Sequence, residues 1–186
     1  MTGHWPAPCA VSTTTRCCCA TAPRVRPTPV AEGPLAHLEG TWQGTGRGSY
    51  PTIEPFTYNE TVTFTALLGK PVFAYTQRTT SADGTPMHTE VGYLRPVGTE
   101  GVELVVAQPT GVTETHDGVA GYEPDGAWAV TFTSLQVGLT PNAKEVVSVW
   151  RALRVRGDTL TYELSMAAVG QPMTPHLWAT LQRIKD

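Results

Sequence analysis

Hydrophobic and polar residues alternate with a period of two along much of the chain beyond Trp42. The alternation is clearest in residues 60–66 (ETVTFTA), 126–134 (GAWAVTFTS) and 158–166 (DTLTYELSM). Successive side chains of a β-strand point to opposite faces, so each segment is predicted to be a strand with one buried face. The residues on the buried faces are Val62, Phe64, Ala66, Trp128, Val130, Phe132, Leu160, Tyr162, Leu164 and Met166.

Clusters of Gly, Asp and Pro separate these segments about every 8 to 15 residues and predict tight turns. In chain order they are LLGKP, SADGTP, RPVGTEG, THDG, EPDG and RGD. Helical spacing is limited to Leu35 and Leu38, which predict one short helical turn before Gly40. We therefore expect an all-β fold, an antiparallel meander of eight to ten strands. Because open sheet edges invite aggregation, the meander should close into a barrel with room for one small ligand.

Residues 1–33 differ in composition from the rest of the chain. They hold five prolines among Ser, Thr and Ala without a hydrophobic period, which predicts a disordered leader before a barrel domain at residues 34–186. An early start codon would also account for them. All four cysteines lie here, at Cys9, Cys17, Cys18 and Cys19. Their spacing lacks the CxxC pairs of a zinc site, so a metal site in this segment is only a minor alternative.

The charge and hydropathy of the chain narrow the classes of partner. Residues 35–186 carry 10 basic and 15 acidic side chains, whereas a nucleic-acid-binding protein needs a basic face. No apolar run approaches the ~18 residues of a membrane span. Free thiols in a chain without a signal peptide favour a reducing compartment, and we expect the cytoplasm. Long barrel strands often present an outer face that can form a dimer interface, so a homodimer is an open alternative.

Residues 40–56 (GTWQGTGRGSYPTIEPF) combine four alternating glycines with Trp42. The glycines are expected to let the backbone curl tightly, and the large Trp42 side chain to plug one end of the barrel. The spacing superficially resembles a phosphate-binding glycine loop. That interpretation is rejected, because neither a parallel βαβ unit nor a helix follows the motif.

Together with five later segments, this motif closely resembles the nitrobindin family. The later segments are GKPVFAYTQRT, DGTPMHTEVGYLR, ELVVAQPTGVTE, NAKEV and MAAVGQPMTPHL. The likeness covers about residues 35–184 and includes the GxWxGxG signature at Gly40, Trp42, Gly44 and Gly46. It implies a closed antiparallel barrel of ten strands, similar in shape to fatty-acid-binding proteins and other calycins, that holds haem b. It also implies that ferric haem isomerises peroxynitrite to nitrate and binds nitric oxide.

The resemblance also implies which residues contact the cofactor. His176, in QPMTPHL, matches the proximal histidine that ligates the haem iron. Imidazole suits iron, and a single axial nitrogen leaves the opposite face of the haem free. By period two alone, His176 shares a face with Trp178, while Leu177 and Ala179 take the other face. The remaining cofactor-binding residues implied by the resemblance are Thr52, Met87, His88, Gln108, Lys144 and Met166.

The sequence pattern supports these six residues unevenly. Met166 ends an apolar row and should face inward, and Gln108 at the end of another such row needs a hydrogen-bond partner. His88 shares its face with Glu90, which taken alone favours solvent. We expect the Thr52 hydroxyl to contact a haem propionate and Lys144 to supply a countercharge to one, although Lys144 fits an exposed turn equally well. The other histidines are His4 in the leader, His37 in the helical turn and His116 in a predicted hairpin loop.

Three functions remain open from the sequence. The first is a haem enzyme that isomerises peroxynitrite, and the second is a carrier or sensor of haem or nitric oxide without turnover. The third is a haem-free barrel that binds an apolar small molecule. The presence of His176 favours haem over the third, because an unligated apolar guest has no use for an imidazole. Neither a Ser/His/Asp set nor a Cys/His set is visible in the sequence, so most of the chemistry would belong to the cofactor.

Overall fold

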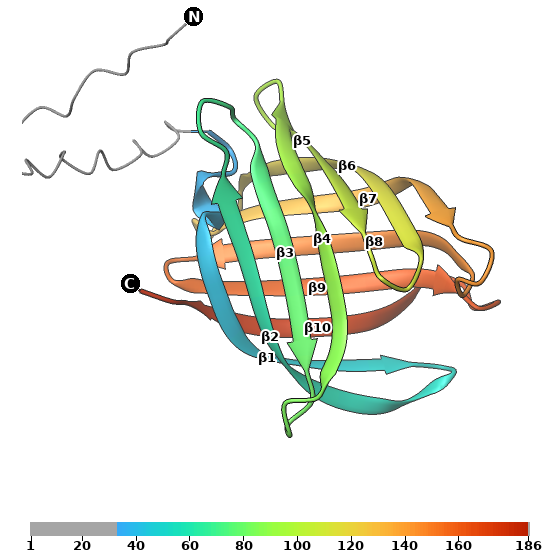
Figure 1. Cartoon of the computed structure of the whole chain (residues 1–186). Helices are drawn as coiled ribbons and strands as arrows, with labels where there is room; N and C mark the ends of the chain where they lie inside the picture. The colour runs from blue at the N-terminus through green and yellow to red at the C-terminus, as the bar shows by residue number, and fades with distance from the viewer. Residues whose placement is uncertain (1–32, 186) are drawn as a thin grey trace, which may run out of the picture.

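Residues 33–185 of the chain are described by the structure, a computed structural model. Their ten strands form one closed antiparallel barrel in the order β1-β10-β9-β8-β7-β6-β5-β4-β3-β2, which confirms the predicted fold class (Figure 1). The strands are β1 Gly40–Tyr50, β2 Ile53–Ala66, β3 Phe73–Thr80, β4 Pro86–Val97, β5 Gly101–Ala107, β6 Val112–Tyr122, β7 Trp128–Leu139, β8 Val146–Arg156, β9 Thr159–Ala168 and β10 Thr174–Arg183. Among these residues, no helix is long and apolar enough to cross a membrane.

The predicted leader and its four cysteines lie outside the described residues, so the domain boundary at residue 34 stays a prediction. Within the described part, one predicted turn is wrong. Residues 115–118 (THDG) lie inside β6, with His116 buried rather than in a hairpin loop. The ladder continues here because Gly118 has no side chain, and a Cβ at this position would overlap the Phe132 ring of β7.

One end of the barrel is closed by a short 3-10 helix, η1 (Ala36–Leu38). Leu35 and Leu38 are buried beside Trp42, whose indole Nε1 donates a hydrogen bond to the Leu38 carbonyl at 2.8 Å. The Arg183 guanidinium lies over the indole, 4.0 Å from its centroid. The predicted helical turn and the predicted plug are therefore both confirmed.

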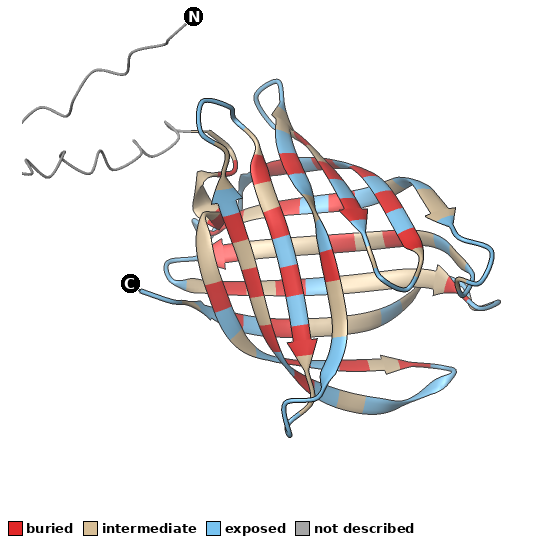
Figure 2. Ribbon diagram, viewed as in Figure 1, coloured by how far each residue is buried: buried red, intermediate tan, exposed pale blue. Residues whose placement is uncertain are grey.

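The core of the closed half is apolar. Figure 2 shows buried and exposed residues alternating along the strands, as a period of two requires. The inward side chains meet in a single cluster above Trp42. Its largest members include Val62, Phe64, Phe73, Tyr75, Leu94, Leu104, Trp128, Phe132, Leu160, Tyr162 and Leu181.

A layer of buried polar side chains crosses the barrel above this core. Arg151 of β8 donates from Nη1 to Glu90 Oε1 at 2.5 Å and from Nη2 to Glu114 Oε2 at 2.8 Å. His116 Nε2 lies 2.7 Å from the same Glu114 oxygen. Burial by itself would raise the pKa of each carboxyl group, but the Arg151 charge holds the pKa of Glu90 and of Glu114 below its usual value.

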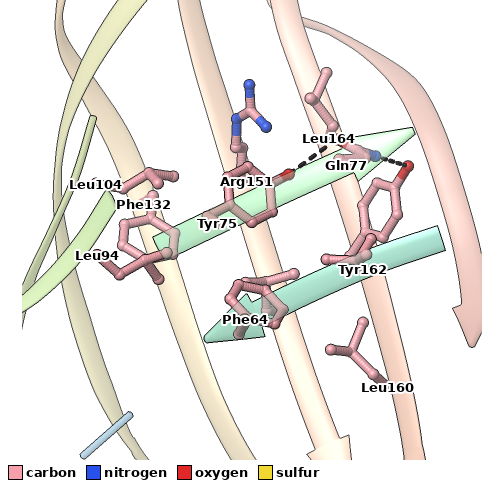
Figure 3. Close-up of a pocket in the computed structure, with 12 residues that line it drawn as sticks. Phe64, Tyr75, Gln77, Leu94, Leu104, Phe132, Arg151, Leu160, Tyr162 and Leu164 are labelled. Atoms are coloured by element: carbon pink, nitrogen blue, oxygen red, sulfur yellow. Dashed lines mark hydrogen bonds between the residues drawn. The ribbon is translucent and has the colours of Figure 1, made fainter. Parts of the chain in front are cut away.

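The layer continues from Glu90 to the opposite wall through Tyr75, Gln77 and Tyr162, which Figure 3 shows beside Arg151. The Tyr75 hydroxyl lies 2.5 Å from Glu90 Oε1 and 2.9 Å from Gln77 Oε1. Gln77 Nε2 donates to Glu60 and to the Tyr162 hydroxyl, the latter at 3.1 Å. Burial raises the pKa of Glu60 to about 8, because no cation of the layer directly pairs with its carboxyl group. Glu60 is therefore protonated at neutral pH, unlike Glu90.

Two glycines of β1 make room for aromatic side chains beside this layer. Gly46 pairs with Tyr58 and Gly48 with Phe56 across the β1–β2 ladder. A Cβ at either glycine would overlap the ring of its partner. Both glycines lie in the extended strand, so they permit close approach rather than the tight curl expected from the sequence.

Substituting Gly46 is expected to destabilise the barrel through this contact. In Gly46→Ala, the new methyl group should displace Tyr58 and its 2.8 Å hydrogen bond to Tyr162, at a cost of about 1–3 kcal/mol in the free energy of unfolding. The measurement is equilibrium unfolding in urea. Gly121→Ala is the matched control, because among the described residues nothing lies within 4 Å of a Cβ at Gly121 of β6. Equal effects of the two substitutions would contradict the prediction.

The state of Glu60 predicts a pH dependence of stability. The pKa of Glu60 is about 8 in the folded protein and near 4.5 when exposed. The contribution of Glu60 to the free energy of unfolding is therefore largest below the exposed value and is lost as pH rises from there through about 8. Relative to Glu60→Gln, the wild type should lose about 3–4 kcal/mol of unfolding free energy between pH 5 and pH 9.

Urea unfolding at pH 5, 7 and 9 measures this difference. Glu163→Gln, at an exposed site of β9, should show no such trend when compared with the wild type. A constant difference between the wild type and Glu60→Gln at all three pH values would mean that Glu60 does not change its protonation state over this range.

Candidate functional site

An open cavity of about 590 Å³ fills the half of the barrel opposite Trp42. This volume is within the ~300–1,000 Å³ usual for small-molecule sites. The polar layer forms its floor, and mainly apolar side chains form its walls. The residues that line it are Phe56, Tyr58, Gln77, Thr79, Met87, His88, Glu90, Gln108, Thr110, Val112, Glu114, Asn142, Lys144, Val146, Val149, Arg151, Leu164, Met166, His176 and Leu177.

The cavity is open because the sheet splits at this end. β7 and β8 pair with each other only as far as Thr133 and Trp150. Beyond that point β7 remains paired with β6, and β8 with β9. The last link between them is a hydrogen bond from the Val149 N–H to the Ser134 hydroxyl at 2.9 Å. The barrel is therefore closed by Trp42 at one end and open at the other.

His176 reaches the cavity through a β-bulge in β10. The ladder with β9 pairs Pro175 with Ser165 and then Leu177 with Leu164, which leaves His176 as the extra residue. Pro175 has no N–H to donate to the ladder, and prolines within sheets occur at such irregular positions. His176 and Leu177 consequently both line the cavity. The face predicted from period two is wrong for His176, because the bulge shifts the alternation by one residue.

The imidazole of His176 is held in one tautomer. Its Nδ1 lies 3.1 Å from the Ser49 carbonyl oxygen, which can only accept, so Nδ1 carries the proton. The Tyr50 ring packs edge-on at 5.3 Å between centroids, and the Tyr50 hydroxyl accepts a hydrogen bond from the Ala168 N–H at 3.0 Å. Burial lowers the pKa of His176, with a further decrease from His88 and a partly opposing effect of Ser49. The imidazole is therefore neutral, and its Nε2 has a free lone pair.

This arrangement fits an axial ligand of a haem. Metal-binding histidines usually donate their other N–H to a carbonyl or carboxylate, which fixes the ring, as Ser49 does here. Nε2 of His176 has no hydrogen-bond partner among residues 33–185. The same part of the chain has no group of three or more His, Cys, Asp or Glu residues arranged for a metal ion. A haem requires only one such ligand, because the porphyrin supplies the other four nitrogens.

Five of the other six predicted residues line the same cavity, namely Met87, His88, Gln108, Lys144 and Met166. Gln108 has the partner that its position required, since its Nε2 donates to Glu114 Oε1 at 2.7 Å. Lys144 is exposed and also lines the cavity, and its contact with a propionate stays a prediction. Thr52 is exposed in the turn between β1 and β2 and is not among the lining residues. Its contact with a cofactor stays a prediction.

His88 and Glu90 point into the barrel, so the interpretation that favoured solvent is wrong. Glu90 is only 1% exposed, and His88 is half-buried with its Nε2 3.6 Å from Glu90 Oε2. A carboxylate is tolerated on this inward face because Arg151 reaches it from β8. His88 thus presents an imidazole to the cavity from the strand β4, whereas His176 presents one from β10.

Sequence reasoning did not find the polar floor. Its signal was present as charged residues inside inward apolar rows, such as Arg151 between Val149 and Leu153 or Glu114 after Val112. An inward charge on one strand predicts a partner of opposite charge on another. No sequence signal predicts the contact with the Ser49 carbonyl, because every residue type has a backbone carbonyl.

Comparison with known proteins agrees with this geometry. A family model described as a THAP4-like, heme-binding beta-barrel domain matches residues 31–183. A protein named peroxynitrite isomerase from Nocardia farcinica is 50% identical over 150 residues, which cover 80% of this chain and 88% of that protein. Peroxynitrite isomerase 2 from Mycobacterium avium is 48% identical over 151 residues, with 80% and 92% covered.

A solved structure shares the fold. The crystal structure of Rv2717c from M. tuberculosis superposes with a TM-score of 0.77 at 46% sequence identity, covering 81% of this chain and 95% of that chain. The matched residues include nearly the whole barrel, from the segment before η1 to the end of β10. The chain therefore belongs to the family of THAP4-like, heme-binding β-barrel domains, the nitrobindin family.

Proposed function

We propose that the chain binds one ferric haem b in the open cavity, with His176 Nε2 as the axial ligand of the iron. The observation that carries this proposal is the fixed, neutral imidazole: the Ser49 carbonyl accepts a hydrogen bond from Nδ1–H, and Nε2 is left free beside a cavity with mainly apolar walls. Apolar walls such as Val112, Leu164 and Met166 suit the faces of a porphyrin. Lys144 at the mouth suits a propionate.

We propose further that the haem-loaded protein isomerises peroxynitrite to nitrate. The relatives named peroxynitrite isomerase support this reaction, since they match this chain over four fifths of its length. Bound ferric haem would supply a Lewis-acidic iron that promotes rearrangement of the peroxide bond without an external reductant. His176 would be the side chain that holds the iron in the cavity.

The chain's own residues would bind and orient rather than transfer protons. His88 and Gln108 are the polar groups in the cavity wall that suit contact with a bound anion. Gln108 is already fixed by Glu114, and His88 is held by its backbone N–H, which donates to the Thr79 hydroxyl at 2.9 Å. The open mouth would admit a small anion directly, and the barrel wall would keep haem monomeric.

Nitric oxide is the second ligand that we propose for the same site. A diatomic needs only a free axial position and an open route, and the cavity mouth supports such a route. A carrier or sensor would use the same residues as the enzyme, so turnover decides between them. A haem-free carrier of an apolar guest is less well supported, because such a guest would leave the His176 Nε2 lone pair unused.

Removing the axial ligand should abolish tight haem binding. Titration of wild-type apoprotein with hemin is expected to give a sharp Soret band at one equivalent, whereas His176→Ala should bind at least about tenfold more weakly. His37→Ala is the matched control, because His37 lies in η1 at the closed end. Equal hemin affinity of His176→Ala and the wild type would remove His176 from the axial role.

The enzyme proposal predicts catalysis that depends on the protein. In stopped-flow mixing, haem-loaded wild type should accelerate peroxynitrite decay and shift the product from nitrite towards nitrate. Apoprotein and His176→Ala should do neither, because the iron is missing or not held in the cavity. A decay rate no higher than that of free hemin would reject the enzyme and favour the carrier or sensor of haem and nitric oxide.

A further inference from the structure

The loop between β7 and β8, residues 140–145, borders the open end of the cavity and is named the strap. Two of its residues, Asn142 and Lys144, line the cavity. Because β7 and β8 do not pair with each other at this end, no ladder between them fixes the strap. Its position must therefore depend on contacts of its two ends with neighbouring turns.

The first end of the strap is held by the turn between β5 and β6. The Thr140 N–H donates to the Gly111 carbonyl at 2.9 Å, and the Ala143 N–H donates to the Thr140 carbonyl at 3.0 Å. Gly111 has a φ of +86°, and a Cβ there would overlap the Thr140 hydroxyl. Gly111 thus allows the strap to lie directly against this turn.

The second end is held by Glu145. Its carbonyl oxygen accepts a hydrogen bond from the Val169 N–H at 3.1 Å, and its carboxylate accepts one from the Gly170 N–H at 3.1 Å. One residue therefore binds two successive amides of the turn between β9 and β10. Figure 1 shows the strap and this turn side by side at the right of the barrel.

The turn that Glu145 binds is strained. Val169 has a φ of 46° and is the sole residue other than glycine with positive φ in the described part of the chain. A β-branched residue disfavours this conformation, which persists where the surroundings enforce it and which is typical of ligand clamps. Release of the strap would free the Val169 N–H and let its backbone relax, so strap opening and turn relaxation are coupled.

We propose that Glu145 is a positioning residue for the ligand of the cavity. By binding the β9–β10 turn it latches the strap over the mouth and keeps Lys144 and Asn142 against the ligand. The identity of the ligand as haem rests on the proposed function. The latch itself is a property of the protein without ligand, so the two ideas can fail separately.

Hydrogen–deuterium exchange of the apoprotein tests the latch alone. In Glu145→Ala, the amides of Ala143, Val169 and Gly170 should exchange about 3- to 10-fold faster, as expected when a hydrogen bond to a charged group is lost at an exposed site. Glu100→Ala is the matched control, since Glu100 is exposed in the β4–β5 turn at the closed end. Unchanged exchange at these amides in Glu145→Ala would overturn the latch.

Hemin release tests the role of the latch in binding. Wild type and variants loaded with hemin are mixed with excess apomyoglobin, and transfer is followed in the Soret region. Glu145→Ala should release hemin about 3- to 10-fold faster than the wild type. Val169→Gly keeps both N–H donors and removes the strain, so it should release hemin no faster.

The outcomes separate the two ideas. Faster exchange together with wild-type release from Glu145→Ala would show that the strap does not hold the ligand, and would overturn the positioning role. Fast release from Val169→Gly would likewise overturn it, because the latch is intact in that variant. Failure of the wild type to bind hemin would overturn the proposed function, while amide exchange would still decide the latch.

Discussion

A closed barrel of ten strands encloses more space than its inward side chains fill, and the rest of the structure depends on this constraint. At one end the surplus is taken up by large rings, with Trp42 as the plug and Phe64 and Phe132 above it. At the other end the chain supplies no such filling, and a cavity of about 590 Å³ remains. The barrel thus divides into a packed half that stabilises it and an open half that is free for a ligand.

The boundary between the two halves is where charged groups meet. Arg151 is bound by Glu90 and Glu114, whereas Glu60 has no cation directly paired with it and takes up a proton. Each solution avoids an unpaired buried charge, which would cost several kcal/mol. The hydrogen bonds of the layer hold these polar atoms in place beneath the cavity.

The sequence predicted what local rules govern and missed what depends on distant partners. Alternation over residues 158–166 identified an inward row because a regular strand imposes it. The same rule misplaced His176, since a single bulge inverts the faces. The turn propensity of Asp and Gly wrongly predicted a turn at Asp117–Gly118, which lies inside β6. The family resemblance identified His176 as a residue of the cavity. Neither the alternation nor the resemblance identified Arg151, whose partners lie on other strands.

The irregularities of the ladder gather in the open half. Register shifts occur between Gly48 and Tyr50, Arg78 and Thr80, Thr115 and His116, Val146 and Ser148, and Pro175 and Leu177. The closed half has regular pairing throughout the described residues. A bulge bends its strand and redirects a side chain, so these irregularities change which side chains face the cavity. The bulge at His176 places its imidazole in the cavity, because in regular alternation the imidazole would face away from it.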